Sequence, residues 1–264
     1  MTMTDTALRP RASALDRRVA MRLAATEYGR VVDLLRSLTP SQWAAPTDCP
    51  GWDVTAMAGH LLGMAEMAAS IRENSRQTKA AGARGGVFID ALTAIQVEEH
   101  AGLTPDQLVA RFAEVAPKAA KGRRRAPWFI RRRTLPMPQH VNGVDEPWTI
   151  GYLIDVVLTR DPWLHRIDIA RATGAVLVHT ADHDGVIVDD VVREWAGRHG
   201  KACTLRLTGL AGGTWTFGTG SASITANQGA AGGGPSLEHD AIEFCRSISG
   251  RGSADGLLTT EVPF

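Results

Sequence analysis

The stretch RDPWLHRIDIARATG (residues 160–174) is predicted to form a helix whose buried face carries ionisable side chains. Five residues share one helix face because they follow one another at spacings of 4, 3, 4 and 3: Ile154, Leu158, Asp161, His165 and Asp168. Three ionisable groups on an otherwise apolar stripe are costly to bury unless something pairs with them. A bound metal ion would be such a partner.

Helical patterns extend from this stretch back towards the start of the chain. Apolar residues recur at helical spacing, and we expect helices over 14–38, 53–74, 87–100, 104–116 and 148–173. The motifs LTPSQ and LTPDQ begin helices, because Thr, Pro and Gln at these spacings form a capping box. Asp53 is the expected N-cap of the second helix, and Gly174 is the expected C-cap of the last. Long helices with short or moderate connections predict an antiparallel bundle.

The composition changes after Gly174. One more helix is expected before residue 200, then strands over 203–209, 214–220 and 221–227, a flexible Gly-rich loop, and a final helix within 240–252. The predicted fold class is therefore α+β, with a four-helix bundle followed by a smaller α/β domain. The expected boundaries are 1–12 for a disordered tail, 13–174 for the metal-binding bundle and 175–264 for the α/β domain.

The overall composition limits the function classes. Hydrophobic residues make up 44% and charged residues 22% of the 264 residues, which is ordinary for a globular protein. The net charge of +1 argues against nucleic acid or anionic membrane as a partner. No apolar run approaches the roughly 20 residues of a membrane span, and the N-terminus lacks the apolar centre of a signal peptide. The three cysteines form no CxxC pair, which fits a reducing cytoplasm and leaves a metal to His and carboxylate ligands.

The candidate metal ligands come from two helices. Asp161 and His165 have the i, i+4 spacing that lets one helix turn hold a single ion. His60, on the apolar stripe of the second helix, is either a satisfied core histidine or a third ligand. Two histidines and a carboxylate with an open position suit catalytic zinc, and also nickel or iron. Asp168, one turn further on, would orient His165 as a supporting carboxylate.

An alternative interpretation of the same helix stays open on spacing alone. Pro162 follows Asp161, and Asp-Pro commonly begins a helix, so Asp161 could be an N-cap and His165 a surface residue beside Arg166. The apolar stripe nevertheless continues in phase through Pro162, which favours a kink within a longer helix. Three other features are interpreted as structural. These are a basic solvated connector at 121–133, helix punctuation at 179–184, and Cys49.

Two of these stretches, together with the C-terminal tail, resemble a known family. LTPSQWAAPTDCPGWDVTAMAGHLLG (38–63), TRDPWLHRIDIARATG (159–174) and DAIEFCRSISGRGSADGLLTTEVPF (240–264) resemble signatures of the maleylpyruvate isomerase family of mycothiol-dependent enzymes, within the DinB-like bundle superfamily. The resemblance implies a four-helix bundle with a divalent metal, usually zinc. It also implies a C-terminal domain related to sterol-carrier-protein-like folds.

The resemblance also implies roles for particular residues. It places the metal ligands on His60, Asp161 and His165, although the family has Glu where this chain has Asp161. Because Asp is one methylene shorter, either the helices must approach more closely or the metal must shift. The resemblance further implies an arginine in the C-terminal domain that meets the charge of the substrate. Arg246 is the candidate for this catalytic role, and Arg251 is the alternative.

The implied chemistry is that of a metal-bound thiolate. Coordination to a divalent cation deprotonates a thiol such as mycothiol at neutral pH, and the thiolate can then attack an electrophile. If the thiol later leaves, the result is isomerisation; if it stays, the enzyme is an S-transferase. We therefore expect a cytoplasmic monomer or homodimer whose partners are a small-molecule thiol and an electrophilic substrate. The alternatives are a hydrolase that uses metal-activated water, with Asp168 as base, and a non-catalytic binding or regulatory protein.

Overall fold

The structure, a computed structural model, describes residues 9–219 and 234–264. The chain groups into two compact units, each made of separate stretches. Leu15–Arg133 and Thr149–Leu177 form what we call the helical unit. The described residues within Met1–Ala14, Thr134–Trp148 and Val178–Phe264 make up what we call the mixed unit. The α+β class, with a helical part and a smaller α/β part, is confirmed.

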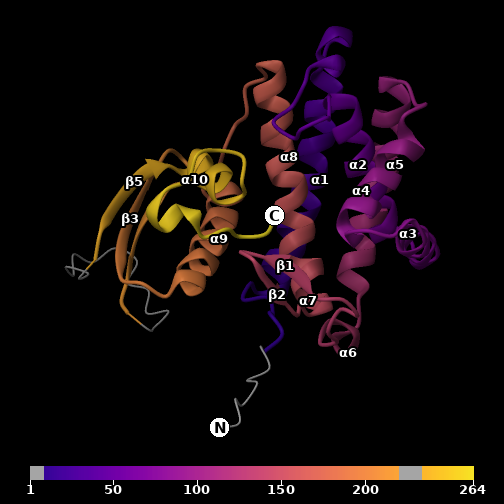
Figure 1. Cartoon of the computed structure of the whole chain (residues 1–264). Coiled ribbons are helices and arrows are strands. Elements are labelled where there is room, and N and C mark those ends of the chain that lie inside the picture. Colours follow the sequence, from indigo (N-terminus) through magenta and orange to yellow (C-terminus); the bar gives the residue numbers. More distant parts are fainter. Residues whose placement is uncertain (1–8, 220–233) are drawn as a thin grey trace. The chain divides into compact units, whose positions relative to one another are not determined.

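The helical unit is built around four long helices that lie side by side (Figure 1). These are α1 (Arg17–Ser37), α2 (Val54–Ala69), α5 (Pro105–Arg125) and α8 (Leu158–Thr173). The shorter elements are η1 (Pro40–Ala44), α3 (Ile71–Arg84), α4 (Phe88–His100), α6 (Trp128–Arg131), α7 (Ile150–Tyr152) and η2 (Leu153–Val157). Side chains of α1, α2 and α5 form most of the core, with Ile169 contributed by α8. The four-helix bundle is therefore present, with α3 and α4 packed on α2.

Local capping explains several helix ends. The Asp53 side chain accepts a hydrogen bond of 2.8 Å from the Ala56 N–H, so the predicted N-cap of α2 is confirmed. Thr104 and Gln107 form the predicted capping box at α5, and Gly174 ends α8 with φ of 70°. The helix predicted over 53–74 is instead broken at Ser70. That residue ends α2 in an extended conformation and caps α3 with its side chain.

The backbone around the start of α8 is irregular. Pro162 lies inside α8, as predicted, and has no backbone N–H to donate to the Leu158 carbonyl. A π-helical turn, η2, precedes it. Arg123, from the end of α5, donates to the Leu158 carbonyl over 2.9 Å and to the Ile154 carbonyl over 2.6 Å. Its side chain is buried, so the solvated connector predicted for 121–133 is wrong at this residue. A buried guanidinium here replaces the partner that Pro162 removes.

The mixed unit contains a three-stranded sheet with helices packed against it (Figure 1). Its elements are β1 (Gln139–Val141), β2 (Val144–Glu146), α9 (Asp184–His199), β3 (Cys203–Thr208), β4 (Gly213–Phe217), β5 (Ser236–Asp240), α10 (Ala241–Ile248) and η3 (Gly256–Thr259). The strand order is β4-β3-β5, antiparallel between β3 and β4 and parallel between β3 and β5. β3 buries alternate residues, as its pattern predicts. The strand expected over 221–227 lies outside the described residues.

A β1–β2 hairpin explains why 134–148 groups with the mixed unit. Its turn is Asn142-Gly143, both at positive φ, as a type I′ turn requires. Asn142 exchanges two hydrogen bonds of 2.7 Å with the backbone of Glu261. Arg11 also pairs with this segment through a backbone bond of 2.8 Å to Pro147. The expected domains were continuous stretches, whereas these contacts join three separate stretches into one unit.

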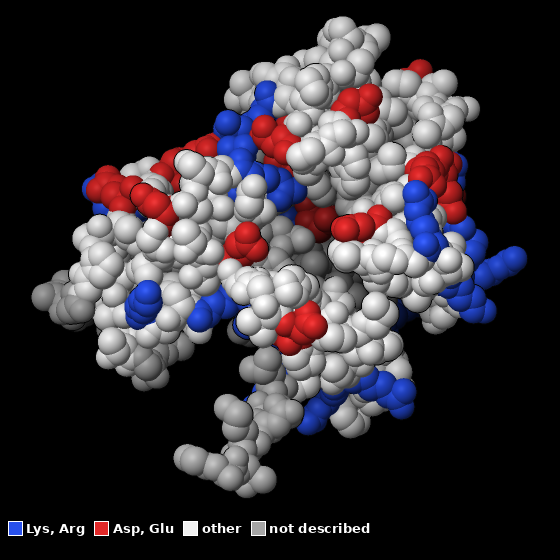
Figure 2. All heavy atoms as spheres, in the orientation of Figure 1, with Lys and Arg blue, Asp and Glu red and all other residues white. Residues whose placement is uncertain are grey.

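Charge is distributed rather than concentrated on the face seen in Figure 2, where acidic and basic side chains are interspersed. Many of them are paired on the surface, such as Arg84 with Glu98 and Arg206 with Glu238. Within the described part of the chain, no helix is both long and apolar enough to cross a membrane.

Candidate metal centre

His60, Asp161 and His165 converge within the helical unit. His60 comes from the middle of α2, and the other two come from successive turns of α8. One oxygen of Asp161, Oδ1, lies 3.4 Å from His60 Nε2 and 3.4 Å from His165 Nε2. All three candidate ligand atoms lie within 4.8 Å of one another. The structure thus brings together the three residues that the sequence pointed to.

The spacing and chemistry of these atoms fit a divalent metal. Ligands about 2.0–2.1 Å from a tetrahedral ion lie roughly 3.3 Å apart, close to the two separations measured from Asp161 Oδ1. The second oxygen, Asp161 Oδ2, is buried and has no hydrogen-bond partner among the described residues. A buried carboxylate oxygen in this position is costly unless a cation satisfies it. Two imidazoles and one carboxylate are also the donor set that zinc, nickel and iron accept.

The electrostatics of the cluster are those of a buried ion pair. Burial alone would raise the pKa of Asp161, but the neighbouring His60 and His165 imidazoles lower it below its usual value. Burial alone would lower the pKa of His165, but the Asp161 carboxylate raises it well above its usual value. Asp161 therefore carries its negative charge within the cluster. A metal ion can take the place of the proton that the neighbouring His165 imidazole would otherwise bind.

These contacts exclude the alternative interpretation of the helix. Asp161 is not the N-cap of α8, which begins three residues earlier and follows directly from the helical residues of η2. His165 is 6% exposed rather than a surface residue. Its neighbour Arg166 is also buried and pairs with Glu27 over 2.5 Å. Pro162 is thus an interior residue of an irregular helix, as its position in the apolar stripe indicated.

The other nitrogen of His165 faces a second group of polar side chains. Nδ1 lies 3.2 Å from Asp168 Oδ2, so the contact expected for the supporting carboxylate is present. Cys49 Sγ lies 4.0 Å from the same nitrogen and 3.9 Å from Asp168 Oδ2. Cys49, Asp168 and His165 Nδ1 form a second arrangement that could hold a metal ion. The position of Cys49 beside His165 is not evident from the sequence, because 116 residues separate the two.

Two further residues complete the surroundings of the cluster. The Trp52 ring lies against both imidazoles, with centroids 5.1 Å from His60 and 6.0 Å from His165. The Gln96 side chain lies 2.8 Å from His60 Nδ1. Trp52 gives the cluster an apolar wall, and Gln96 gives His60 a polar partner. Neither residue was predicted to belong to the site from the sequence, although Trp52 is part of the CPGW motif.

Arg246 belongs to the mixed unit, on α10. Its side chain is buried, with Nη1 2.8 Å from Glu243 Oε2 and Nη2 3.4 Å from the Arg251 carbonyl. Its role towards the substrate stays a prediction. At residues 179–184, Asp184 accepts a hydrogen bond of 2.8 Å from the Thr180 N–H at the start of α9, which fits the structural interpretation of this segment.

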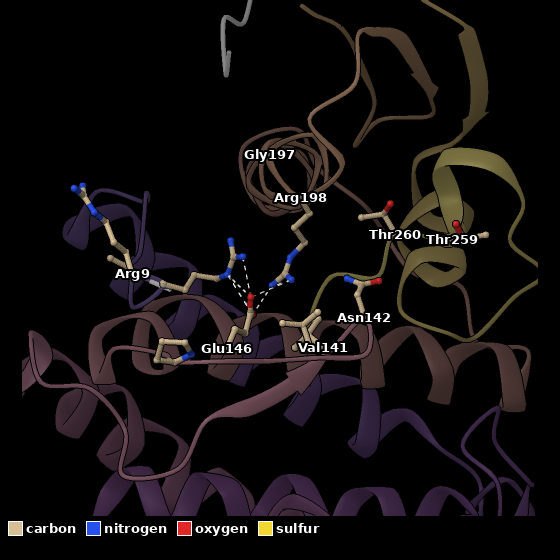
Figure 3. Close-up of a pocket in the computed structure, with 12 residues that line it drawn as sticks. Arg9, Val141, Asn142, Glu146, Gly197, Arg198, Thr259 and Thr260 are labelled. Carbon is tan, nitrogen blue, oxygen red and sulfur yellow. Dashed lines mark hydrogen bonds and ion pairs between the residues drawn. The ribbon is translucent and has the colours of Figure 1, made fainter. Parts of the chain in front are cut away.

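The mixed unit also contains a cavity of about 600 Å³ (Figure 3). Arg11 and Arg198 both converge there on Glu146, at 2.9 Å and 2.7 Å. Burial would raise the pKa of Glu146, but the two guanidinium groups lower it. Two guanidinium groups thus share one carboxylate on this wall, and none of the predicted site residues lines the cavity.

Comparison with known proteins supports the resemblance noted in the sequence. The model of a family described as "Mycothiol maleylpyruvate isomerase N-terminal domain" matches residues 24–170. Two solved structures are similar in fold: a mycothiol-dependent maleylpyruvate isomerase (16% identity) and a histidine-to-alanine mutant of it (14% identity). In each case the TM-score is 0.55, with 94% of this chain and 95% of the other covered. No curated protein matches the chain in sequence.

Proposed function

Because the chain belongs to the mycothiol maleylpyruvate isomerase N-terminal domain family, an enzyme family, we propose that it is a metal-dependent thiol enzyme. Its cosubstrate would be mycothiol or a related small thiol, and its second substrate a small electrophile. The observation that carries the proposal is the buried Asp161 Oδ2, which has no hydrogen-bond partner in the described part of the chain and lies beside two imidazole nitrogens. His60, Asp161 and His165 would hold the ion, most simply zinc, with nickel or iron as alternatives.

The bound ion would supply a lowered thiol pKa, so that the thiol reacts as a thiolate at neutral pH. The chain's own residues prepare the site for this. Asp168 accepts a hydrogen bond from His165 Nδ1 and leaves the Nε2 lone pair directed at Asp161. The Trp52 ring lies against the two imidazoles and forms an apolar wall beside them. The shorter side chain of Asp161 still brings Oδ1 to 3.4 Å from His60 Nε2 on the facing helix.

The second substrate would accept the thiol and develop negative charge. Arg246 is the residue that we assign to that charge. Release of the thiol after rearrangement would give isomerisation, and its retention would give S-transfer. We place this activity in the cytoplasm, in a monomer or homodimer.

Hydrolysis by metal-activated water is less well supported. It would need a base beside the open metal position, and Asp168 is the carboxylate considered for that role. Asp168 instead contacts His165 Nδ1, on the far edge of the ring from Nε2. In this arrangement Asp168 would position a ligand of the ion and would not serve as a base beside it.

The test compares the metal content of the wild-type protein with that of His165→Ala, followed by assays with mycothiol. About one divalent ion per chain, lost in the variant, together with mycothiol-dependent conversion of maleylpyruvate or of another electrophile, would support the proposal. Turnover that is independent of thiol would favour hydrolysis. Absence of metal in both proteins, even after incubation with zinc or nickel, would contradict the proposal.

A further inference from the structure

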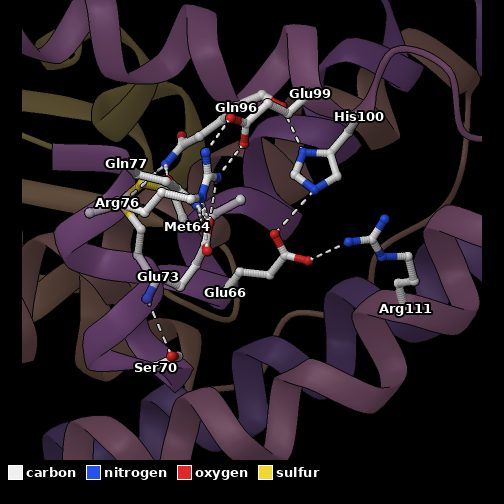
Figure 4. A network of polar contacts seen from close by, with 12 residues as sticks. Met64, Glu66, Ser70, Glu73, Arg76, Gln77, Gln96, Glu99, His100 and Arg111 are labelled. Carbon is white, nitrogen blue, oxygen red and sulfur yellow. Dashed lines mark hydrogen bonds and ion pairs between the residues drawn. The ribbon is translucent and has the colours of Figure 1, made fainter. Parts of the chain in front are cut away.

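A chain of amide side chains leads from the outside of the helical unit to His60. Gln77 Nε2 lies 2.9 Å from Glu73 Oε1 and 3.2 Å from the Gly63 carbonyl oxygen. Gln96 Nε2 lies 2.9 Å from Gln77 Oε1, and Gln96 Oε1 lies 2.8 Å from His60 Nδ1. Figure 4 shows Gln77 and Gln96 close together within a wider network of polar contacts. Both glutamines are fully buried.

The outer end of this chain fixes the direction of every hydrogen bond in it. The Gly63 carbonyl and the Glu73 carboxylate can only accept, so Gln77 must turn its NH₂ group towards them. Its oxygen then faces Gln96, which must donate in turn. Reversing both amides would place Gln77 Oε1 against two acceptors. The direction of the chain therefore does not depend on how any single amide is assigned.

Two thioether groups reinforce the orientation of Gln96. Its Nε2 lies 3.1 Å from the Met64 sulfur and 3.3 Å from the Met67 sulfur, and thioethers accept but do not donate hydrogen bonds. The Oε1 atom is left to face His60 Nδ1, which must therefore carry the proton. In a neutral imidazole the remaining nitrogen, Nε2, then holds the lone pair. Nε2 is the atom that lies 3.4 Å from Asp161 Oδ1.

The packing of α2 against α4 makes room for this arrangement. A Cβ atom at Gly63 would come within 2.6 Å of Gln96 Cγ, so the absence of a side chain there lets Gln96 lie against α2. The same glycine provides the carbonyl that orients Gln77. Gly63 thus both leaves room for Gln96 and orients Gln77.

We propose that Gln96, held in orientation by Gln77, is a positioning residue that presents the Nε2 lone pair of His60 to the metal. This inference rests on the proposed function, because it takes His60 as a ligand. Outer hydrogen-bond partners of metal-bound histidines are commonly carboxylates or backbone carbonyls, and their loss typically weakens metal binding 10–100-fold. Here a buried neutral amide takes that place, with its acceptor direction set by Gln77 of α3 and by the Gly63 carbonyl of α2.

The experiment compares two substitutions that separate positioning from packing. Gln96→Met keeps an unbranched side chain of similar size but removes the acceptor for His60. Gln96→Glu keeps an acceptor for His60 but places a carboxylate against Gln77 Oε1. Zinc affinity would be measured by competition with a chromophoric chelator, and stability by urea unfolding of the metal-free proteins. Leu92→Ala, a buried apolar change on the same helix, is the control.

The expected result is that the two measurements rank the variants differently. Gln96→Met should bind zinc 10–100-fold more weakly than wild type. Gln96→Glu should bind within a few-fold of wild type while unfolding at a lower urea concentration. Leu92→Ala should lose stability and keep its zinc affinity. Wild-type affinity in Gln96→Met, or zinc affinities that simply follow stability, would overturn the inference.

His60→Ala separates this outcome from failure of the proposed function. If the wild-type protein binds no zinc, or binds it equally well after His60→Ala, the proposed metal site itself is wrong. If His60→Ala abolishes binding and Gln96→Met does not weaken it, the metal site stands and only the positioning role of Gln96 fails.

Discussion

Replacing Arg123 tests whether its guanidinium replaces the hydrogen bond that Pro162 removes from α8. In Arg123→Met the carbonyl oxygens of Leu158 and Ile154 lose donors at 2.9 and 2.6 Å in a buried region. Each buried acceptor left unsatisfied costs about 1–3 kcal/mol, so the gross loss is about 2–6 kcal/mol. Relief from burying a cation offsets part of this loss. We expect the free energy of unfolding to fall by about 2–4 kcal/mol, a large share of the 5–15 kcal/mol typical of whole proteins.

A double-mutant cycle with Pro162→Ala makes this prediction specific. Alanine restores an N–H four residues after Leu158, so the Leu158 carbonyl regains a donor from its own helix. Urea unfolding, followed by circular dichroism, should then show that Arg123→Met costs about 1–3 kcal/mol less in the Pro162→Ala background than in wild type. An equal cost in both backgrounds would refute the link between Arg123 and Pro162, since Arg123 would then stabilise the bundle for some other reason.

Three further predictions concern the metal cluster and its surroundings. By elemental analysis, Asp161→Asn should lose the roughly one zinc ion bound per chain, and Cys49→Ser should keep it. Loss of zinc in Cys49→Ser but not in Asp161→Asn would instead assign the ion to the group of Cys49, Asp168 and His165 Nδ1. The stability difference between wild type and His100→Gln should shrink as the pH rises from about 6 to 9. Burial lowers the pKa of His100, but Glu66 raises it above its usual value. The stabilisation by the charged His100–Glu66 pair is therefore complete below about pH 6.5 and is lost as the pH rises through the folded-state pKa. A stability difference that grows with pH in urea unfolding would contradict this prediction. Gly63→Ala should lower both the urea midpoint and zinc affinity because its Cβ would meet Gln96; an unchanged zinc affinity would show that α4 can shift without disturbing the site.

The features that the sequence predicted are those set by residues close together along the chain. The Asp53 cap depends on an N–H three residues away, and the Asp161–His165 pair on one helix turn. His60 was recognisable because a histidine on an apolar stripe needs a partner. The alternation of β3 likewise follows from its own six residues.

The features that the sequence did not predict depend on contacts between distant residues. Arg123 sits in a run of basic residues, and only its reach to Ile154 and Leu158 on another helix distinguishes it from a solvated arginine. Gln96 has no local signal, because its partner His60 lies 36 residues away. β5 was missed because its pairing with β3 spans 32 positions and it follows a Gly-rich stretch that indicates a loop. The π turn at 153–157 was hidden by an apolar stripe that fits a regular helix.

The path of the backbone around residues 134–148 has a consequence for dissecting the protein. This segment leaves the helical unit after Arg133 and returns at Thr149, and the Ile150 N–H still donates to the Arg133 carbonyl over 2.8 Å. The two ends of the excursion thus meet where it begins. A truncation near residue 174 would strand the β1–β2 hairpin without the Glu261 backbone that holds its turn. Excising 134–148 and joining its flanks through a short linker would instead leave the bundle, with its ligand residues, as one uninterrupted chain.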